Sequence, residues 1–320
     1  MHLVCPAGSP PALMTAVDHG ADAVYVGFRD QTNARAFPGL NFSEADLRAG
    51  IRYAHARGRK VYVALNTYPG PARFGDWQAA VDRAAALGVD AIICADMGVL
   101  DYAARMHPTL PRHLSVQGSA TTHAALRYYR ERFGIARAVL PRVLSIQQVE
   151  RLCEQDVVPI EVFAFGSLCI MVEGRCQLSS YVTGASPNRH GVCSPAKFVR
   201  WEEGPDGQRG VRLNDRLIDR FEVGEPAGYP TVCKGRYDVG GNVFHALEEP
   251  TSLNTLELLP RLAAAGVVAL KIEGRQRGQA YVAAVTRTWR AALDRFSARP
   301  AGWSPDPQSQ RELARHAEGR

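Results

Sequence analysis

Short apolar segments alternate with amphipathic helical segments along most of this chain, and this alternation limits the folds it can adopt. The apolar segments are near-continuous runs, which is typical of strands buried on both faces of a parallel sheet. Seven of them lie at 3–5, 23–27, 60–66, 90–96, 113–117, 136–142 and 158–166. An eighth lies at 267–274, after a helical segment for which Ser252 is the predicted N-cap.

Eight strand–helix units predict an α/β fold of the TIM-like (β/α)8 barrel type. An open doubly wound sheet is the alternative, but no G-x-G-x-x-G turn follows the first strand. The eighth unit is displaced, so we expect a cysteine-rich, loop-rich insertion over 167–250, between strand 7 and the last helix–strand pair. We therefore predict one catalytic barrel domain over 1–298 and a polar, disordered C-terminal tail over 299–320.

Four cysteines in the predicted insertion are candidate metal ligands: Cys169, Cys176, Cys193 and Cys233. The chain shows no signal peptide and no apolar run long enough to span a bilayer, so we expect a reducing cytoplasm, where cysteines more often bind metals than form disulfides. Thiolates favour zinc, copper(I) or iron, and the four could hold one zinc or one iron–sulfur cluster. No pair has C-x-x-C spacing, so the ligands would come from separate loops; His190 is a further contender.

Polar residues follow several predicted strands at their carboxyl ends, where the active sites of such barrels are built. Glu273 is the best candidate for a general acid or base. Arg142 and Arg275 suit a carboxylate or phosphate group, because a guanidinium binds such groups bidentately. The candidates for substrate binding are Asn66, Gln117, Glu161 and Arg277, and the loop after the second strand adds Asn33 and Arg35.

Several function classes lack their motifs here. The sequence contains no H-E-x-x-H zinc-protease helix, no P-loop and no G-x-S-x-G elbow. The net charge of +6 permits contact with nucleic acid, but the basic residues are scattered and form no block. We therefore expect neither peptidase activity nor a nucleic-acid partner.

The stretches LVCPAGSPPAL, TNARAFPGLNF, FGSLCIMVEGRCQLSSY and KIEGRQR resemble the collagenase-like peptidase family U32, from residue 3 to about 290. Within that family, ALEEPTSLNTLELLP resembles the UbiU branch, whose members are subunits of an oxygen-independent hydroxylase in anaerobic ubiquinone biosynthesis. The resemblance implies that the four cysteines bind a [4Fe-4S] cluster. It also implies a heterodimer with a homologous UbiV-type subunit and a UbiT-type lipid-carrier accessory protein.

The expected substrate is then the aromatic ring of a polyprenylated phenol, with prephenate as a candidate oxygen donor held by Arg142, Arg275 and Arg277. Two alternatives stay open. One is oxygen-independent hydroxylation of an RNA base, although those relatives usually carry an added RNA-facing domain for which we expect no room beyond residue 300. The other is a non-catalytic scaffold whose cluster stabilises a partner subunit.

Overall fold

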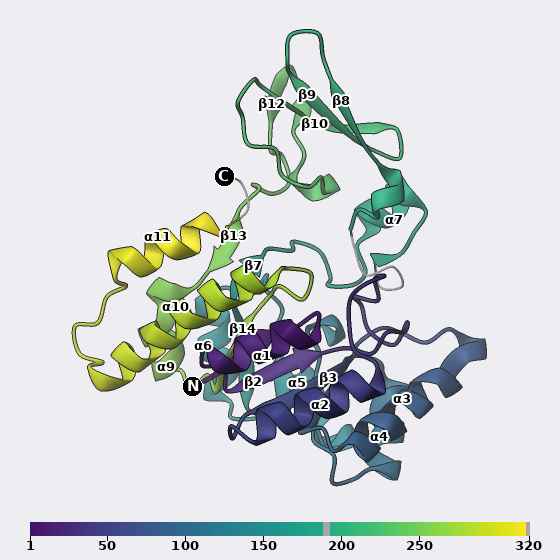
Figure 1. Ribbon diagram of the computed structural model, residues 1–320, viewed down its shortest axis with the longest axis vertical. Helices are drawn as coiled ribbons and strands as arrows, with labels where there is room; N and C mark the ends of the chain where they lie inside the picture. Colours follow the sequence, from purple (N-terminus) through teal and green to yellow (C-terminus); the bar gives the residue numbers. More distant parts are fainter. Residues whose placement is uncertain (188–192, 318–320) are drawn as a thin grey trace.

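The computed structural model describes residues 1–187 and 193–317, and its centre is a closed barrel of parallel strands (Figure 1). Neighbouring strands pair in parallel, and the pairing of β6 with β7 closes the ring. The barrel strands are β1 (His2–Pro6), β2 (Ala23–Val26), β3 (Lys60–Leu65), β4 (Ala91–Cys94), β5 (Arg112–Leu114), β6 (Arg137–Val139), β7 (Ile160–Ser167) and β14 (Ala269–Ile272). The predicted (β/α)8 TIM-like barrel is confirmed.

Amphipathic helices surround the barrel and bury their apolar sides against it. They are α1 (Pro10–Asp18), α2 (Glu44–His55), α3 (Phe74–Leu87), α4 (Met97–Met106), α5 (His123–Phe133), α6 (Ile146–Glu154), α9 (Leu259–Ala264) and α10 (Gln279–Ala298). Ser43 caps α2 as predicted, in a capping box with Asp46. Within the described ranges, no helix has the length and apolarity that crossing a membrane requires.

Most of the described chain between β7 and Ser252 forms a separate lobe beyond one end of the barrel (Figure 1). It contains α7 (Gln177–Thr183), an antiparallel sheet of β8 (Val199–Glu203), β9 (Arg209–Leu213) and β10 (Arg216–Phe221), and a hairpin of β11 (Tyr237–Val239) and β12 (Asn242–Phe244). A small apolar core that includes Val211, Leu213 and Phe221 stabilises this lobe. The lobe therefore contains more regular structure than a loop-rich segment.

Two local predictions are wrong. Ser252 does not cap a helix, because Ser252–Asn254 form β13, which pairs antiparallel with the carboxyl end of β7. The pairing of β6 reaches only the first residues of β7, so the far end of β7 leaves an edge to which β13 adds. The C-terminal tail is not disordered over its described part, because Pro307–Arg315 form helix α11, which packs on α10 and buries Leu313 completely.

Candidate active site at the barrel mouth

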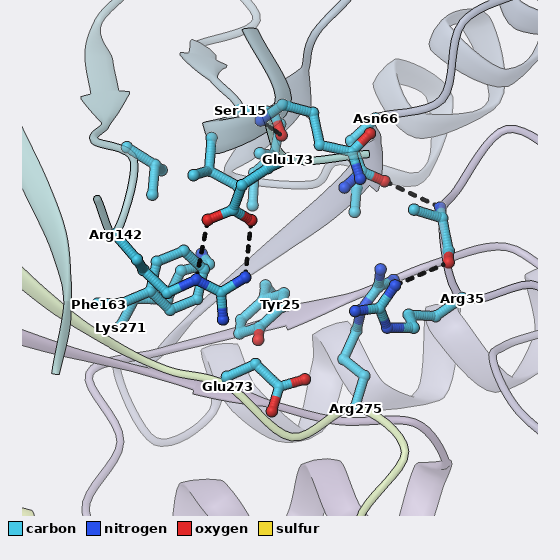
Figure 2. A pocket seen from close by; sticks show the side chains of 16 residues that line it. Tyr25, Arg35, Asn66, Ser115, Arg142, Phe163, Glu173, Lys271, Glu273 and Arg275 are labelled. Atoms are coloured by element: carbon cyan, nitrogen blue, oxygen red, sulfur yellow. Dashed lines mark hydrogen bonds and ion pairs between the residues drawn. The ribbon is translucent and has the colours of Figure 1, made fainter. Parts of the chain in front are cut away.

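A small pocket opens at the carboxyl ends of the barrel strands; it offers about 70 Å³ to the centre of a water-sized sphere and is partly open to solvent. Six of the predicted site residues lie in its wall: Arg35, Asn66, Gln117, Arg142, Glu273 and Arg275. Figure 2 shows Arg142 on one side, Arg275 with Arg35 on the other, and Glu273 and Tyr25 between them. Residues from widely separated parts of the chain meet here because the barrel brings every strand end to the same face.

Glu273 follows β14 directly and is held in place by its neighbours. Its backbone carbonyl accepts a hydrogen bond from the Tyr281 hydroxyl at 2.9 Å. Gly166, at the end of β7, has a φ of +126°, and a Cβ there would lie 2.5 Å from the Glu273 Cβ. Only glycine, which has no Cβ, lets the end of β7 come this close to Glu273. The carboxylate consequently faces the pocket rather than the barrel wall.

Arg275 is a buried cation on the opposite side of the pocket. Its side chain donates a hydrogen bond to Asn33 Oδ1 at 3.1 Å, and the residue is 5 % exposed. Burial lowers the pKa of its guanidinium to about 10, helped by the nearby charge of Arg35, so the group stays charged at neutral pH. We find no carboxylate in an ion pair with Arg275 in the part of the chain that the structure describes. Because burying such a charge is costly, the site suits an anionic ligand.

Arg142 has a different environment, because a carboxylate from the insertion already binds it. Glu173 accepts from its Nε at 2.8 Å and from its Nη2 at 2.7 Å, while Nη1 donates to the Ser167 carbonyl. Burial opposes the charge on Arg142, but Glu173 outweighs burial and raises the pKa of the guanidinium. The sequence predicted Arg142 but not Glu173, which no local pattern distinguishes from other acidic loop residues.

Glu161 does not line the pocket, contrary to its prediction as a substrate-binding residue. It lies on the same face of β7 as Phe163 but two residues earlier, which places it one layer deeper inside the barrel. There its carboxylate binds Lys271 Nζ at 2.8 Å and Arg137 at 2.9 Å. Lys271 lines the pocket floor, and the sequence patterns did not predict it as a site residue. Burial raises the pKa of Glu161, but these two cations lower it by more, so the pKa lies below its usual value.

Two further candidates, Asn33 and Arg277, are not part of the pocket wall: Asn33 lies behind it and accepts the hydrogen bond from Arg275, and Arg277 lies outside it. The backbone N–H of Arg277 donates to the Gly274 carbonyl at 2.9 Å, which turns the chain away from the mouth. The guanidinium lies over the Tyr281 ring, 5.3 Å from the centroid. We infer no role for this exposed side chain in the pocket.

The four candidate cysteines lie in one region but are not drawn together at metal-binding distance. Burial raises the pKa of Cys193 to about 11, and Cys169, Cys176 and Cys233 raise it further, so the four thiols lie within electrostatic reach of one another. Each of three uses a local partner: Cys169 donates to the Met171 carbonyl, Cys176 caps α7, and Cys233 contacts Thr231. No group of three or more metal-ligating side chains is formed within 1–187 and 193–317.

The chemistry of this donor set nevertheless fits a soft metal or an iron–sulfur cluster, because four thiols lie within electrostatic reach of one another. Cys169, Cys193 and Cys233 are partly buried, and Cys169 lies in the segment that directly follows barrel strand β7. Arg35, which lines the pocket, also lowers the pKa of Cys193, so pocket and thiols are close. His190 lies outside the described residues.

Residues 8–320 match the sequence profile described as Peptidase family U32. The chain belongs to this family. Among curated relatives it is 30 % identical to "tRNA hydroxylation protein P" of Escherichia coli over 322 residues, covering 91 % of this chain and 67 % of the relative. It is 29 % identical to the "23S rRNA 5-hydroxycytidine C2501 synthase" of the same organism, and the match covers 92 % of this chain and 39 % of that relative. It is 30 % identical to "Collagenase" of Porphyromonas gingivalis, and the match covers 92 % of this chain and 66 % of that relative.

These names divide the U32 relatives into RNA hydroxylation proteins and a protein named as a protease. The chain spans about two thirds of the length of the tRNA hydroxylation protein and of the collagenase, and less of the rRNA enzyme. Hydroxylation is therefore the activity class that most of the reported U32 relatives carry in their names. None of them is named for ubiquinone biosynthesis, so the expected UbiU assignment is more specific than the similarity supports.

Proposed function

We propose that this chain is the core of an oxygen-independent hydroxylase whose substrate is a nucleobase of RNA. The observation that carries the proposal is the pocket at the barrel mouth, where buried cations and the carboxylates of Glu173 and Glu273 line a common space near four cysteines. The names of the U32 relatives support RNA as the substrate and reverse the preference that the sequence motifs favoured. We place the activity in the reducing cytoplasm, where thiols stay available as ligands.

In this proposal Cys169, Cys176, Cys193 and Cys233 hold a [4Fe-4S] cluster, which when bound supplies electron transfer. Arg275 binds an anionic group of the oxygen donor, because its charge is buried and its hydrogen-bond and ring partners within the described residues, Asn33 and the Tyr25 ring, are both uncharged. Tyr25 and Phe163 line the same pocket and offer aromatic surfaces for a ring. Glu273 accepts the proton that leaves the ring carbon when the carbon–oxygen bond forms.

Hydroxylation of a ring C–H by a hydroxyl donor balances without dioxygen. The ring loses hydrogen and gains hydroxyl, while the donor loses hydroxyl and gains hydrogen. Prephenate, which carries two carboxylates and a hydroxyl group, remains our candidate donor. A carboxylate of such a donor matches the guanidinium of Arg275 in charge and geometry.

The aromatic ring of a polyprenylated phenol is the second candidate substrate, and one observation favours it. The lobe between β7 and β14 carries several large exposed apolar side chains, namely Val172, Tyr181, Trp201, Tyr229, Val243 and Phe244. Such surfaces suit an apolar tail or a protein that carries it. On this reading a UbiV-type subunit and a UbiT-type carrier would be the partners.

Mass spectrometry of cells grown without oxygen, with and without the gene, tests both candidates. We expect one hydroxylated nucleoside to disappear from the tRNA or rRNA digest, with quinones unchanged. Loss of the quinone with intact RNA would favour the second candidate. Complementation with Glu273→Gln tests the scaffold alternative, since a scaffold would restore the product fully and a catalytic subunit would not.

A further inference from the structure

We propose that Glu173 is a positioning residue that couples the occupancy of the four-cysteine site to the ligand affinity of the pocket. The inference rests on the proposed function only in assuming that these cysteines bind a metal cluster. Glu173 lies between Cys169 and Cys176 in the sequence, within the short segment that follows β7. One segment therefore supplies two cysteines and the partner of Arg142.

The contact between Glu173 and Arg142 is closely defined. Both side chains are 8 % exposed, and two parallel hydrogen bonds of 2.8 and 2.7 Å join them (Figure 2). The guanidinium also lies over the Phe163 ring, 4.7 Å from its centroid. A bidentate pair of this kind fixes the orientation as well as the position of the guanidinium. Arg142 has five N–H donors and, within the described ranges, uses three of them on Glu173 and Ser167, which leaves two for a ligand.

The residues after Glu173 attach the same segment to the pocket rim. Gly174 has a φ of +75°, and a Cβ there would lie 2.8 Å from the Gln117 side chain, so only glycine allows this approach. Arg175 lies over the Tyr68 ring at 4.5 Å, and the Tyr68 hydroxyl donates to the Gln117 carbonyl. Movement of this segment would therefore alter the wall of the pocket on the Gln117 side as well as Arg142.

Ligation of Cys169 and Cys176 restrains both ends of the segment that carries Glu173. The restraint keeps Glu173 on Arg142 and so preorganises the two remaining donors for an anionic ligand. When no metal binds the two cysteines, the segment has more conformational freedom. A ligand that enters the pocket must then order the segment, and this entropic cost lowers its affinity. By linkage, a ligand in the pocket must favour the loaded cysteine site to the same extent.

The test is a thermodynamic cycle that compares, without oxygen, the loaded and cluster-free forms of four proteins, namely the wild type and three variants. The probe is 4-hydroxybenzoate, which carries a ring and a carboxylate, and titration calorimetry gives its affinity for each form. The measured quantity is the affinity of the loaded form divided by that of the cluster-free form. Replacing Glu173 by glutamine removes a negative charge, which changes the affinity of the loaded form and of the cluster-free form alike, so this effect cancels in the ratio. The charge of the cluster itself alters the ratio equally in every protein, so it cancels when the ratios of two proteins are compared.

We expect the ratio for the wild-type protein to exceed that for Glu173→Gln by about fivefold or more, the lower end of typical coupling between sites. Arg142→Lys keeps the charge but loses the bidentate contact, so its ratio should fall in the same way. Glu203→Gln, on the exposed strand β8, is the matched control and should keep the wild-type ratio. If Glu173→Gln does not fold, the affinity ratio of Arg142→Lys is compared with that of the wild-type protein instead.

Iron content separates the possible failures. Iron uptake by every protein together with equal ratios would overturn the coupling alone and leave the proposed hydroxylase intact. A wild-type protein that takes up no iron would overturn both the coupling and the cluster part of the proposed function. Absence of any binding of 4-hydroxybenzoate to the loaded wild-type protein would also overturn the inference.

Discussion

Lys271 donates a hydrogen bond of 2.8 Å to Glu161 inside the barrel, where both side chains are at most 5 % exposed. The pair lies directly beneath the pocket, because Lys271 forms part of the pocket floor while Glu161 lies one layer deeper. Arg137 binds the second oxygen of the same carboxylate. A buried ionic cluster thus underlies the pocket, beside apolar barrel residues such as Val4 and Ile93.

Removing the carboxylate of this cluster should destabilise the whole barrel. Glu161→Gln leaves Lys271 buried without its counter-charge, and breaking a buried ion pair from one side costs about 3–5 kcal/mol. Urea denaturation should show a free energy of unfolding lower by that amount. The double variant Glu161→Gln with Lys271→Met should recover part of the loss, since it removes the orphaned ammonium. Equal stability of Glu161→Gln and the wild-type protein would contradict the structural role of the pair.

His113 should make the stability of the barrel sensitive to mild acid. Burial lowers its pKa from 6.5 to about 3, and its Nδ1 has no hydrogen-bond partner within the described residues. Between these values the unfolded chain binds a proton that the folded chain does not, so stability decreases as pH falls from 6.5 towards 3. The expected contribution is a loss of about 2 kcal/mol between pH 7 and pH 5.

His113→Gln tests this directly, because it removes the titrating group. Denaturant unfolding at pH 7 and pH 5 should show a smaller decrease in stability for the variant than for the wild-type protein. Glu161, the acidic neighbour of His113, has a lowered pKa and stays ionised over this interval, so it adds nothing to the difference. Equal decreases in the two proteins would show that His113 does not titrate as the burial predicts.

The barrel was predictable from sequence because its strands are buried on both faces and therefore appear as continuous apolar runs. Each predicted run overlaps an observed strand, and the topology of a barrel then gathers residues such as Asn66 and Glu273 at one mouth. Ser252 shows the limit of local signals. A serine before an apolar run suits a helix cap, but the available edge of β7 is a tertiary feature, and pairing with it formed a strand.

The pocket itself was only partly predictable, for a related reason. Glu173 lies 31 residues from Arg142 in the chain, on a segment without regular structure, and no periodicity connects the two. Glu161 was misplaced because sequence gives the face of a strand but not the depth of a residue along the barrel axis. The strands of the lobe are short and mostly exposed, so they lack the apolar runs that identified the barrel strands.

Cys176 should be essential for iron binding. Its replacement by alanine removes one of four proposed ligands, so anaerobic reconstitution should yield protein without the brown iron–sulfur absorbance and with little iron. Cys153→Ala is the matched control, since Cys153 lies on α6, away from the proposed ligands, and the variant should take up iron normally. Retention of the full spectrum by Cys176→Ala would remove this cysteine from the ligand set.

Arg275 and Arg277 allow a last comparison of two arginines that are neighbours in sequence but not in environment. Arg275 is buried in the pocket wall, whereas Arg277 lies over Tyr281 outside it. Lysine keeps the charge but lacks the planar fork that binds a carboxylate bidentately. Arg275→Lys should therefore lower hydroxylated product by about a hundredfold, the lower end of the loss when one preorganised donor is removed. Arg277→Lys should leave the product within about twofold of the wild-type level, a change of only a few tenths of a kcal/mol in the barrier. Product is quantified by mass spectrometry in complemented cells grown without oxygen, with equal protein levels verified by immunoblot. If the two variants behaved alike, the anionic group of the oxygen donor would have to bind elsewhere than at Arg275.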